Sequence, residues 1–437
     1  MTLGWGSVGH RGEVPETSSP VAARPVLDPL AQLTPELVAL YKDLHQHPEL
    51  SHQEERTAAK VAERVEAAGY DVTTGVGGTG VVGVLHNGDG PTVLLRADMD
   101  ALPVEEQTGL PYASTATATD ADGKTVPVMH ACGHDMHVTC LVGTADLLAR
   151  AKGSWQGTVL AVFQPAEEVG GGARAMVDDG LFDRFGHPDV VLGQHVAPLP
   201  AGTVGYRAGP AFAATDALKV TFFGRGGHGS RPEVTIDPVV MAATTVVRLQ
   251  TVVSREIAGS DIAVVTVGAI NAGTKDNVIP DTAEIKLNIR TYTPDVRHRV
   301  LAAVQRIIKG EAAASGAEKD PDIAVIDTFP VLDNDARATA RTTAAIGAVI
   351  GKGRLYEVPA ATGSEDVGDF ATAAKAPICY WLIGGIDPVR YAKARQAGRI
   401  NLDIPSNHQA TFAPVVEPTL RTGVEALTAA AIEWLGA

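Results

Sequence analysis

Short apolar runs recur through both ends of the chain and are separated by amphipathic stretches. The runs cover residues 81–85, 92–96, 159–163, 190–194 and 378–383. A short run that is almost entirely apolar is typical of a strand that is buried on both faces. Amphipathic stretches of helical period lie between them. The pattern therefore predicts an α/β domain, with a mixed, mostly parallel sheet flanked by helices.

Two amphipathic helices are predicted before the first strand. Thr34 is a typical N-cap residue and Pro35 is favoured at the first helical position, so the first helix is expected to begin there. Ser51 and Glu54 have the spacing of a capping box. We therefore expect the second helix to run from this box to Gly69.

Residues 213–329 have a different rhythm. The expected elements are a strand, a helix, two strands, a helix and a strand, at residues 218–224, 238–254, 262–270, 283–292, 294–314 and 323–327. This order, β-α-β-β-α-β, is the ferredoxin-like arrangement. Asp237 and Thr293 each precede a proline and are predicted to cap the two helices.

The segment with this second rhythm is predicted to be a domain inserted into the first one. The α/β domain would then consist of residues 31–212 and 330–437. A chain of 437 residues is long enough for two such cores.

Charge and composition exclude some classes of partner. The chain has 36 basic and 51 acidic residues, a formal net charge of -15, and no cluster of Lys and Arg. Nucleic acids and anionic membranes are therefore not expected to bind. No segment approaches the ~18 consecutive apolar residues that a membrane span needs.

The cysteines and the N-terminal segment indicate where the protein works. Only Cys132, Cys140 and Cys379 occur, an odd and sparse set that suits a reducing compartment. Residues 1–30 are rich in Pro, Gly and Ser and lack the apolar core of a signal peptide, so a disordered arm is predicted. A cytoplasmic location follows from both observations.

Residues 129–137 (MHACGHDMH) hold the densest chemical signal, a thiol and three imidazoles just before a helix expected at residues 138–149. Thiolate and imidazole are natural ligands of zinc and related divalent ions. Cys132 and His134 are separated by one glycine, so they can reach the same pair of metals. The alternative is a histidine-rich turn that only caps the next helix.

Two adjacent glutamates, Glu167 and Glu168, follow the strand that ends at Phe163. Open α/β sheets place their sites at the carboxyl ends of strands. One carboxylate could bind a metal while its neighbour acts as a base, although adjacent glutamates in a loop are commonly just solvated. His195 ends another strand and His408 lies in a polar turn; either histidine alone could be structural.

Asp98 and Asp100 close the strand at residues 92–96. Asp98 could hold a metal-binding imidazole through a hydrogen bond, which fixes the tautomer and raises the basicity of the ligand. The alternative is an ordinary surface turn.

Together these motifs resemble the M20 metallopeptidase family, in the branch of bacterial N-acyl-amino-acid and hippurate hydrolases and plant auxin-conjugate hydrolases. The likeness includes residues 43–50 (DLHQHPEL), 226–230 (GGHGS), 277–281 (NVIPD) and 363–366 (GSED). It covers nearly everything after the N-terminal arm. The motifs are several and ordered, which makes a chance match implausible.

The resemblance implies a set of metal ligands and a base. Two divalent metal ions, most simply zinc with manganese or cobalt as alternatives, would be bound by Cys132, His134, Glu168, His195 and His408. Glu167 would be the general base. One departure is Arg96, which stands where the wider family often has a histidine ligand, and His134 is expected to replace that ligand.

Further implications concern the inserted domain, which in the family is a lid that also forms a homodimer. His228 would polarise the substrate carbonyl, across the dimer. Asn277 and Arg290 would hold the carboxylate side of the substrate, because the arginine fork pairs with a carboxylate through two hydrogen bonds. An arginine on a strand can equally be ion-paired within the protein.

The expected function is hydrolysis of the amide bond of small N-acyl amino acids, with a metal-activated water and Glu167 as the base. A dipeptidase or aminopeptidase of the same family is one alternative, and it would need a group that recognises a free amine. A non-catalytic amino-acid or metal binding protein is another. The spare glutamate argues against it, because a binding protein has no need of a free base beside its ligand.

Overall fold

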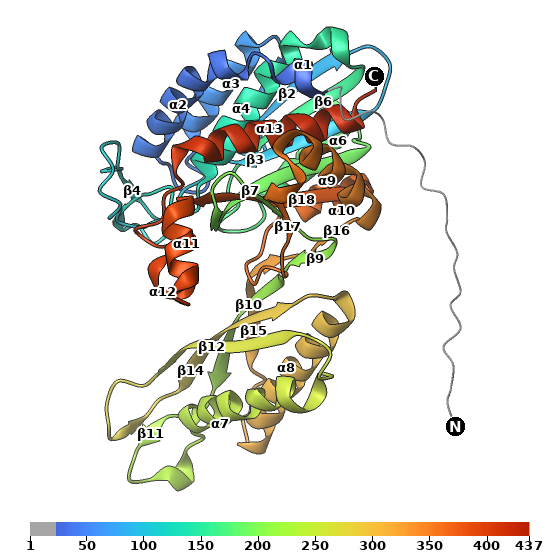
Figure 1. Ribbon diagram of the computed structural model, residues 1–437. Helices are drawn as coiled ribbons and strands as arrows, with labels where there is room; N and C mark the ends of the chain where they lie inside the picture. Colours follow the sequence, from blue (N-terminus) through green and yellow to red (C-terminus); the bar gives the residue numbers. More distant parts are fainter. Residues whose placement is uncertain (1–22, 437) are drawn as a thin grey trace, which may run out of the picture.

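The main sheet is mixed and mostly parallel, as the apolar runs predicted. The structure, a computed structural model, describes residues 23–436 (Figure 1). Strands β6, β3, β7 and β18 are parallel neighbours at the centre, and antiparallel pairs lie toward both ends. The eight strands are, in sheet order, β1 (Asp71–Val76), β2 (Gly80–Asn87), β6 (Gly157–Gln164), β3 (Thr92–Asp98), β7 (Val190–Pro200), β18 (Ile378–Ile386), β8 (Val204–Tyr206) and β17 (Leu355–Glu357).

Helices cover both faces of this sheet. Strand β3 shows why, because Leu95 packs into the core on one face and its neighbour Leu94 into the core on the other. The first face carries α2 (Leu30–Gln46), α3 (Glu55–Ala67), α4 (His134–Arg150), α9 (Ala336–Ile350) and α13 (Val416–Trp434). The second carries α5 (Gly172–Asp178), α6 (Leu181–Phe185) and α10 (Gly368–Ala374).

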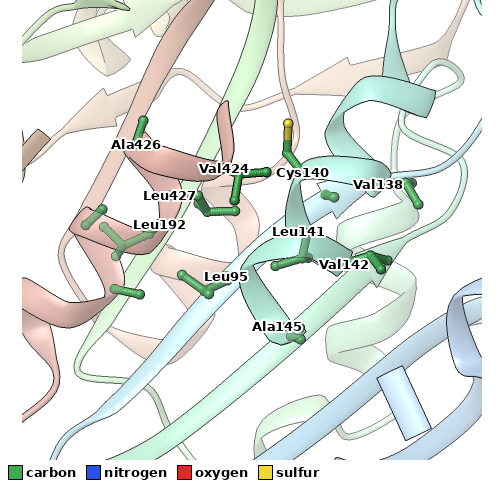
Figure 2. Close-up of a cluster of buried hydrophobic side chains, with 14 of the residues drawn as sticks. Leu95, Val138, Cys140, Leu141, Val142, Ala145, Leu192, Val424, Ala426 and Leu427 are labelled. Carbon is green, nitrogen blue, oxygen red and sulfur yellow. The ribbon is translucent and has the colours of Figure 1, made fainter. Parts of the chain in front are cut away.

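The larger core fixes the position of α4. Figure 2 shows Leu95 of β3 and Leu192 of β7 together with Leu141 of α4 and Leu427 of α13, and all four side chains are buried. Burying one such side chain stabilises the fold by about 1.5–3 kcal/mol. Because α4 begins at His134, this packing also fixes the start of the helix at the candidate site.

The inserted segment forms a separate four-stranded antiparallel sheet with its own apolar core. Its strands are β12 (Ala263–Ala272), β14 (Thr282–Thr291), β10 (Ala214–Phe223) and β15 (Asp322–Phe329), in that spatial order, and α7 (Pro238–Thr251) and α8 (Pro294–Ala314) pack against them. The order and the connections confirm the ferredoxin-like arrangement. We call this unit the lid domain; its limits at residues 213 and 329 stay predictions.

The predicted helix caps of the lid domain are confirmed. The Asp237 side chain accepts a hydrogen bond from the Val239 backbone N–H, and the Thr293 side chain accepts one from Val296. In both helices proline occupies the first position, which has no hydrogen bond to lose. Local sequence alone therefore determined these two helix starts.

The remaining elements are short. They are α1 (Ala23–Leu27), β4 (Thr117–Thr119), β5 (Thr125–Pro127), β9 (Gly209–Phe212), β11 (Gly227–His228), β13 (Val278–Ile279), β16 (Leu332–Asn334), α11 (Pro388–Gln396) and α12 (Ile400–Asp403), with single helical turns at Lys152–Ser154, Pro232–Val234, Val252–Glu256 and Lys352–Arg354. Strands β9 and β16 pair where the chain enters and leaves the lid domain (Figure 1). Among the described residues, no helix is long and apolar enough to cross a membrane.

Two expectations at the N-terminus are wrong. Helix α2 begins at Leu30, so Pro35 lies inside it and Thr34 donates its hydroxyl to the Leu30 carbonyl, 2.8 Å away. Burial of Leu30 and Leu33 in the main core outweighs the local capping signal. The arm predicted for residues 1–30 is too long, because Val26 and Leu30 are buried; its residues 1–22 lie outside the described part of the chain.

The expected capping box is also absent. Helix α3 begins at Glu55, and Ser51 Oγ donates instead to Asp100 Oδ2 at 2.6 Å. The Glu54 carboxylate is buried and accepts hydrogen bonds from Thr79 and from the Ala166 backbone N–H. Apart from the His52 backbone N–H, which donates to Glu54, the hydrogen-bond partners of these two side chains are distant in the sequence.

Arg297 provides a test of the lid domain's stability. Its Nε and Nη2 atoms lie 2.8 and 2.6 Å from the two carboxylate oxygens of Asp216, and Asp216 is only 4% exposed. Arg297→Ala should leave that carboxylate without its cation and lower lid stability by about 1–3 kcal/mol. Amide hydrogen exchange in α8 should accelerate accordingly.

Arg306→Ala is the matched control, because Arg306 is also on α8 but its partner Glu256 is paired with it at the surface. Exchange in α8 should stay at the wild-type rate in this variant. Equal exchange rates in the two variants would contradict a stabilising role for the Arg297 pair.

Candidate metal centre

The predicted ligands meet because their strands are neighbours in the main sheet. Glu168 follows the end of β6, His195 lies on β7, and His134 is the first residue of α4. Strands β6, β3 and β7 are adjacent and parallel, so their carboxyl ends share one edge. Residues far apart in the sequence are thereby placed around one point.

Distances between side-chain atoms define a single cluster. Cys132 Sγ lies 3.4 Å from His195 Nε2, and His134 Nε2 lies 3.7 Å from Glu168 Oε1. His408 Nε2 lies 3.3 Å from Glu168 Oε2. Ligand atoms of Cys132, His134 and Glu168 all lie within 4.8 Å of one another. The structure thus brings together all five residues that the sequence predicted as ligands.

Unpartnered polar atoms indicate that this cluster fits metal ions. Both ring nitrogens of His134 and the Oε1 atom of Glu168 are buried and make no hydrogen bond among the described residues, and the one carboxylate near His134 Nδ1, that of Asp100, is in charge contact at 3.3 Å. A buried polar atom without a partner costs about 1–3 kcal/mol, so such atoms are rare. A set of thiolate, imidazole and carboxylate donors is suited to zinc and to related divalent ions.

Hydrogen bonds at His195 leave one nitrogen free for a metal. Its Nδ1 atom lies 2.7 Å from the Val196 carbonyl oxygen, which can only accept, so Nδ1 carries the proton. The lone pair on Nε2 then faces Cys132. Burial lowers the pKa of His195 to about 4, which keeps the ring neutral, as a ligand must be.

His137 is close to the cluster but is not available as a ligand. The Val196 N–H donates to its Nε2 atom at 2.7 Å, and its Nδ1 atom lies 2.5 Å from Asp98 Oδ1. Burial lowers the pKa of His137 to about 4, so the neutral ring uses its one proton toward Asp98. Both nitrogens are therefore occupied.

Asp98 is bonded to groups other than the predicted ligands. Besides His137, it accepts a hydrogen bond from Arg96 Nη1 at 2.7 Å, and its Oδ2 atom stays 3.6 Å from His134 Nε2. Although burial disfavours the charge, Arg96 and the two histidines hold the pKa of Asp98 well below its usual range. A role for Asp98 in catalysis stays a prediction.

Asp100 is the carboxylate placed to orient His134, a role that its sequence motif does not predict. Its Oδ1 atom lies 3.3 Å from His134 Nδ1. Its Oδ2 atom accepts hydrogen bonds from Ser51 Oγ and from the Glu168 backbone N–H, at 2.6 and 2.9 Å. Asp100 thus contacts the ring of one candidate ligand, His134, and the backbone of another, Glu168. Asp98 and Asp100, at the end of β3 and just after it, were the signal in the sequence, but only their contacts in the structure show which of them lies against His134 Nδ1.

Glu167 lies beside the cluster and is 6% exposed. One of its carboxylate oxygens lies within 4.8 Å of an oxygen of Glu365 and of an oxygen of Asp366. Burial, and then the negative charges of Glu365 and Glu168, raise the pKa of Glu167 well above its usual value. A carboxylate with a raised pKa is a stronger proton acceptor, as a general base should be.

Arg96, the residue that departs from the wider family pattern, compensates these buried charges. Its guanidinium is fully buried and donates to Asp98 and to Glu365, at 2.7 Å each, and to Asp366 at 3.3 Å. It also donates to Gln164 and to the Tyr380 hydroxyl. Glu365 and Asp366 belong to the motif at residues 363–366, which did not predict this role for them, and no sequence motif includes Tyr380.

The lid residues fall into two places. Arg290 lies where the lid domain meets the main domain and donates to the Thr362 carbonyl at 2.6 Å. His228 and Asn277 lie together on the exposed β11–β13 ribbon, where the Gly229 N–H donates to the Asn277 carbonyl. Figure 1 shows β11 at the end of the lid domain that points away from the main sheet. Within one chain, therefore, His228 and Asn277 do not join Arg290 or the metal cluster.

His228 has a defined tautomer. The Ser230 backbone N–H donates to its Nδ1 atom at 3.1 Å, so Nδ1 holds a lone pair. The proton of the neutral ring is then on Nε2. Such a ring can donate a hydrogen bond from Nε2 to a carbonyl oxygen.

Comparisons with known proteins match this description. The profile of peptidase family M20/M25/M40 matches residues 94–404, which contain every candidate ligand except His408. N-acetylcysteine deacetylase of Bacillus subtilis (strain 168) is 38% identical over 291 residues, which are 65% of this chain and 72% of that protein. Hippurate hydrolase of Campylobacter jejuni subsp. jejuni is 41% identical over 291 residues, 66% of this chain and 73% of that protein.

A solved structure is also similar. The YxeP protein of Bacillus subtilis, described as a dinuclear metal binding peptidase from the M20 family, superposes with a TM-score of 0.72. Its sequence is 28% identical to this one, and the match covers 92% of this chain and 98% of that one. The likeness therefore includes both the main sheet and the lid domain.

Asp100→Asn tests the contact with His134. Loss of a carboxylate that orients a histidine ligand typically lowers metal affinity about 10–100-fold. We expect a loss of that size, measured by zinc titration against a chromophoric chelator, with the circular dichroism spectrum unchanged.

Asp146→Asn is the control for this test, because Asp146 lies on the same helix, α4, but pairs with Arg150 near the surface. Its zinc affinity should equal that of the wild type. If Asp100→Asn also binds zinc with wild-type affinity, Asp100 does not orient His134.

Proposed function

The chain belongs to peptidase family M20/M25/M40, and from this membership we propose that it is a metal-dependent amidohydrolase that releases amino acids from small N-acyl amino acids. It is a hydrolase of amide C–N bonds. The two relatives described above are named for N-acetylcysteine and for hippurate, which are both N-acylated amino acids. That shared chemistry supports the substrate class.

One observation carries the proposal most strongly. Glu167 is buried next to Glu168, whose Oε1 atom has no hydrogen-bond partner and lies 3.7 Å from His134 Nε2. Among the described residues, no hydrogen bond or ion pair joins the Glu167 carboxylate to a candidate ligand, and it groups instead with Glu365 and Asp366. One carboxylate can therefore bind a metal while its neighbour handles protons. A protein that only bound metals or amino acids would have no need of this second carboxylate.

The proposed ligands are Cys132, His134, Glu168, His195 and His408. We propose two divalent ions, with zinc favoured by the thiolate and manganese or cobalt as alternatives. Bound there, they would polarise a water molecule and the substrate carbonyl group.

Glu167 accepts a proton from the attacking water while the water oxygen forms a bond to the amide carbon. The C–N bond then breaks, and Glu167 passes the same proton to the leaving amine, so the base is regenerated. His228 donates a hydrogen bond from Nε2 to the oxygen on which negative charge develops. Asn277 and Arg290 are proposed to hold the carboxylate side of the substrate, and Asp98 to support the ligand cluster.

We propose that two copies of the chain associate through the lid domain. Strand β12 is at the edge of its sheet, so its outer backbone groups can pair with another strand. Nearby apolar side chains are unusually exposed: Val264 of β12 by 44%, and Val240 and Val247 of α7 by 52% and 71%. In such a homodimer, His228 would reach the candidate metal centre of the other copy. This agrees with the position of His228 on the end of the lid domain that points away from the main sheet of its own chain.

Two alternative functions are a peptidase of the same family and a non-catalytic amino-acid or metal binding protein, which would have no need of Glu167. A dipeptidase or aminopeptidase of the same family would need a group that binds a free amine next to the cleaved bond.

We also propose a cytoplasmic location. The three cysteines are all free and buried, which suits a reducing compartment.

A substrate panel tests the function. Protein stripped by a chelator is reloaded with zinc, manganese or cobalt singly and assayed on N-acetyl amino acids, N-benzoyl amino acids and dipeptides. We expect metal-dependent release of amino acids from the acylated substrates in preference to dipeptides. Preference for dipeptides would favour the peptidase, and no turnover of any substrate would favour a binding protein.

Glu167→Gln should retain two metal ions per chain and lose about 10²–10⁴-fold in kcat, because the amide cannot accept the proton. Metal content is measured by elemental analysis and kcat by amino-acid release. Glu63→Gln, on the exposed side of α3, should behave as the wild type. A Glu167→Gln enzyme with near-normal kcat would rule out Glu167 as the base.

Mixed dimers test whether His228 acts in the partner's site. His228→Ala and Glu167→Gln should each be nearly inactive alone. When they are denatured together and refolded in equal amounts, a site with both native residues should form in each mixed dimer, giving about one quarter of wild-type activity. No recovery above the sum of the two single variants would show that His228 acts in its own chain or not at all.

A further inference from the structure

Residues 361–366 run from the lid domain to the carboxylates beside Glu167. We call them the connector segment. At its first residues, lid side chains hold the backbone: the Tyr292 hydroxyl donates to the Ala361 carbonyl at 3.0 Å, and Arg290 Nη1 donates to the Thr362 carbonyl at 2.6 Å. Both bonds join the lid domain to a segment of the main domain.

Ser364 is held from the same side. Its hydroxyl bonds to the Thr215 hydroxyl, and Arg290 Nη1 lies 3.3 Å from it. Arg290 also donates from Nε to Asn288 at 3.1 Å. Two of the three guanidinium nitrogens of Arg290 therefore bind protein oxygens.

The other end of the connector segment is fixed inside the main domain. Glu365 accepts hydrogen bonds from Arg96 Nη2 and from the Tyr380 hydroxyl, both at 2.7 Å. Asp366 accepts one from Gln164 Nε2 at 2.7 Å. All of these side chains are buried and in contact, so a shift of this end would be passed on to its buried neighbours.

This fixed end borders the proposed base. Oxygens of Glu365 and Asp366 lie within 4.8 Å of an oxygen of Glu167, and the described residues place one cation, Arg96, against the first two. Like charges at this spacing repel, and the repulsion changes steeply with distance in a buried site. A small shift of Glu365 would therefore move Glu167 away from its working position, and catalysis is sensitive to shifts of about 1 Å.

We propose that Arg290 and Tyr292 are positioning residues, which hold the connector segment and through Glu365 set the place of Glu167. This rests on the proposed function of Glu167 as the base. It assigns Arg290 a role inside the protein, in addition to or instead of a contact with the substrate carboxylate. The lid domain and the base are then coupled through six consecutive residues.

Tyr292→Phe is the first test, because it removes a single hydroxyl that binds only a backbone carbonyl. We expect kcat to fall roughly 2–10-fold, with KM and metal content unchanged, as for one lost hydrogen bond felt in the transition state. Tyr356→Phe is the matched control, since the Tyr356 hydroxyl also donates to a backbone carbonyl, that of Gly353, outside the connector segment. Equal kcat values in the two variants would overturn the proposal.

A double-mutant cycle tests the path through Glu365. In a Glu365→Gln background, Tyr292→Phe should cause little further loss of kcat, because the link to Glu167 is already broken. A purely structural effect of Tyr292 would multiply with that of Glu365→Gln, and this result would contradict the coupling.

Arg290→Ala separates the two roles of the arginine. If Arg290 holds the connector segment, kcat should fall equally for an N-acyl amino acid and for its carboxamide analogue. If Arg290 only binds the substrate carboxylate, KM should rise for the N-acyl amino acid and not for the carboxamide. The second result would count against the proposal. Failure of the proposed function would be seen separately, as normal turnover in Glu167→Gln. All ratios are taken relative to wild type with an amide that the wild type cleaves.

Discussion

Arg96 is buried among three carboxylates, those of Asp98, Glu365 and Asp366, at the carboxyl edge of the main sheet. Removing charged groups from water is costly, and it is tolerated only where opposite charges and hydrogen bonds replace the solvent. One arginine cannot balance this many acids, and Glu167 adds another. The excess negative charge is what makes the adjacent cluster a favourable place for divalent cations, whose binding would stabilise the fold as well as supply chemistry.

This concentration of charge depends on the layers beneath it. The apolar strands β3, β6 and β7 are held by helices on both faces, and α4 packs so tightly that its first residue, His134, has little freedom. Rigid elements can hold polar groups in unfavourable surroundings, because moving them would disrupt the core. The site is thus stabilised by residues that never touch it, such as Leu95.

The lid domain has its own core, and within residues 23–436 the chain enters and leaves it beside the paired strands β9 and β16. An independent core lets such a unit change its orientation without unfolding. Its contacts to residues 361–364 are therefore one route by which a lid movement would be felt at the carboxylates. A fold of this kind can bring a residue such as His228 to a second site while the first stays assembled.

Local sequence determined much of this protein: the buried strands, the order of the lid elements, the caps Asp237 and Thr293, and the side chains that meet in the candidate metal centre. Each depends on a short-range pattern of apolar period, proline position or donor type. The tertiary structure decided which of several eligible side chains face one another. It gave Asp100 the contact with His134, made Ser51 its partner in place of a helix cap, and placed Glu365 beside Glu167. These pairs join segments that are remote in the sequence, and no local pattern encodes the distance between two such atoms.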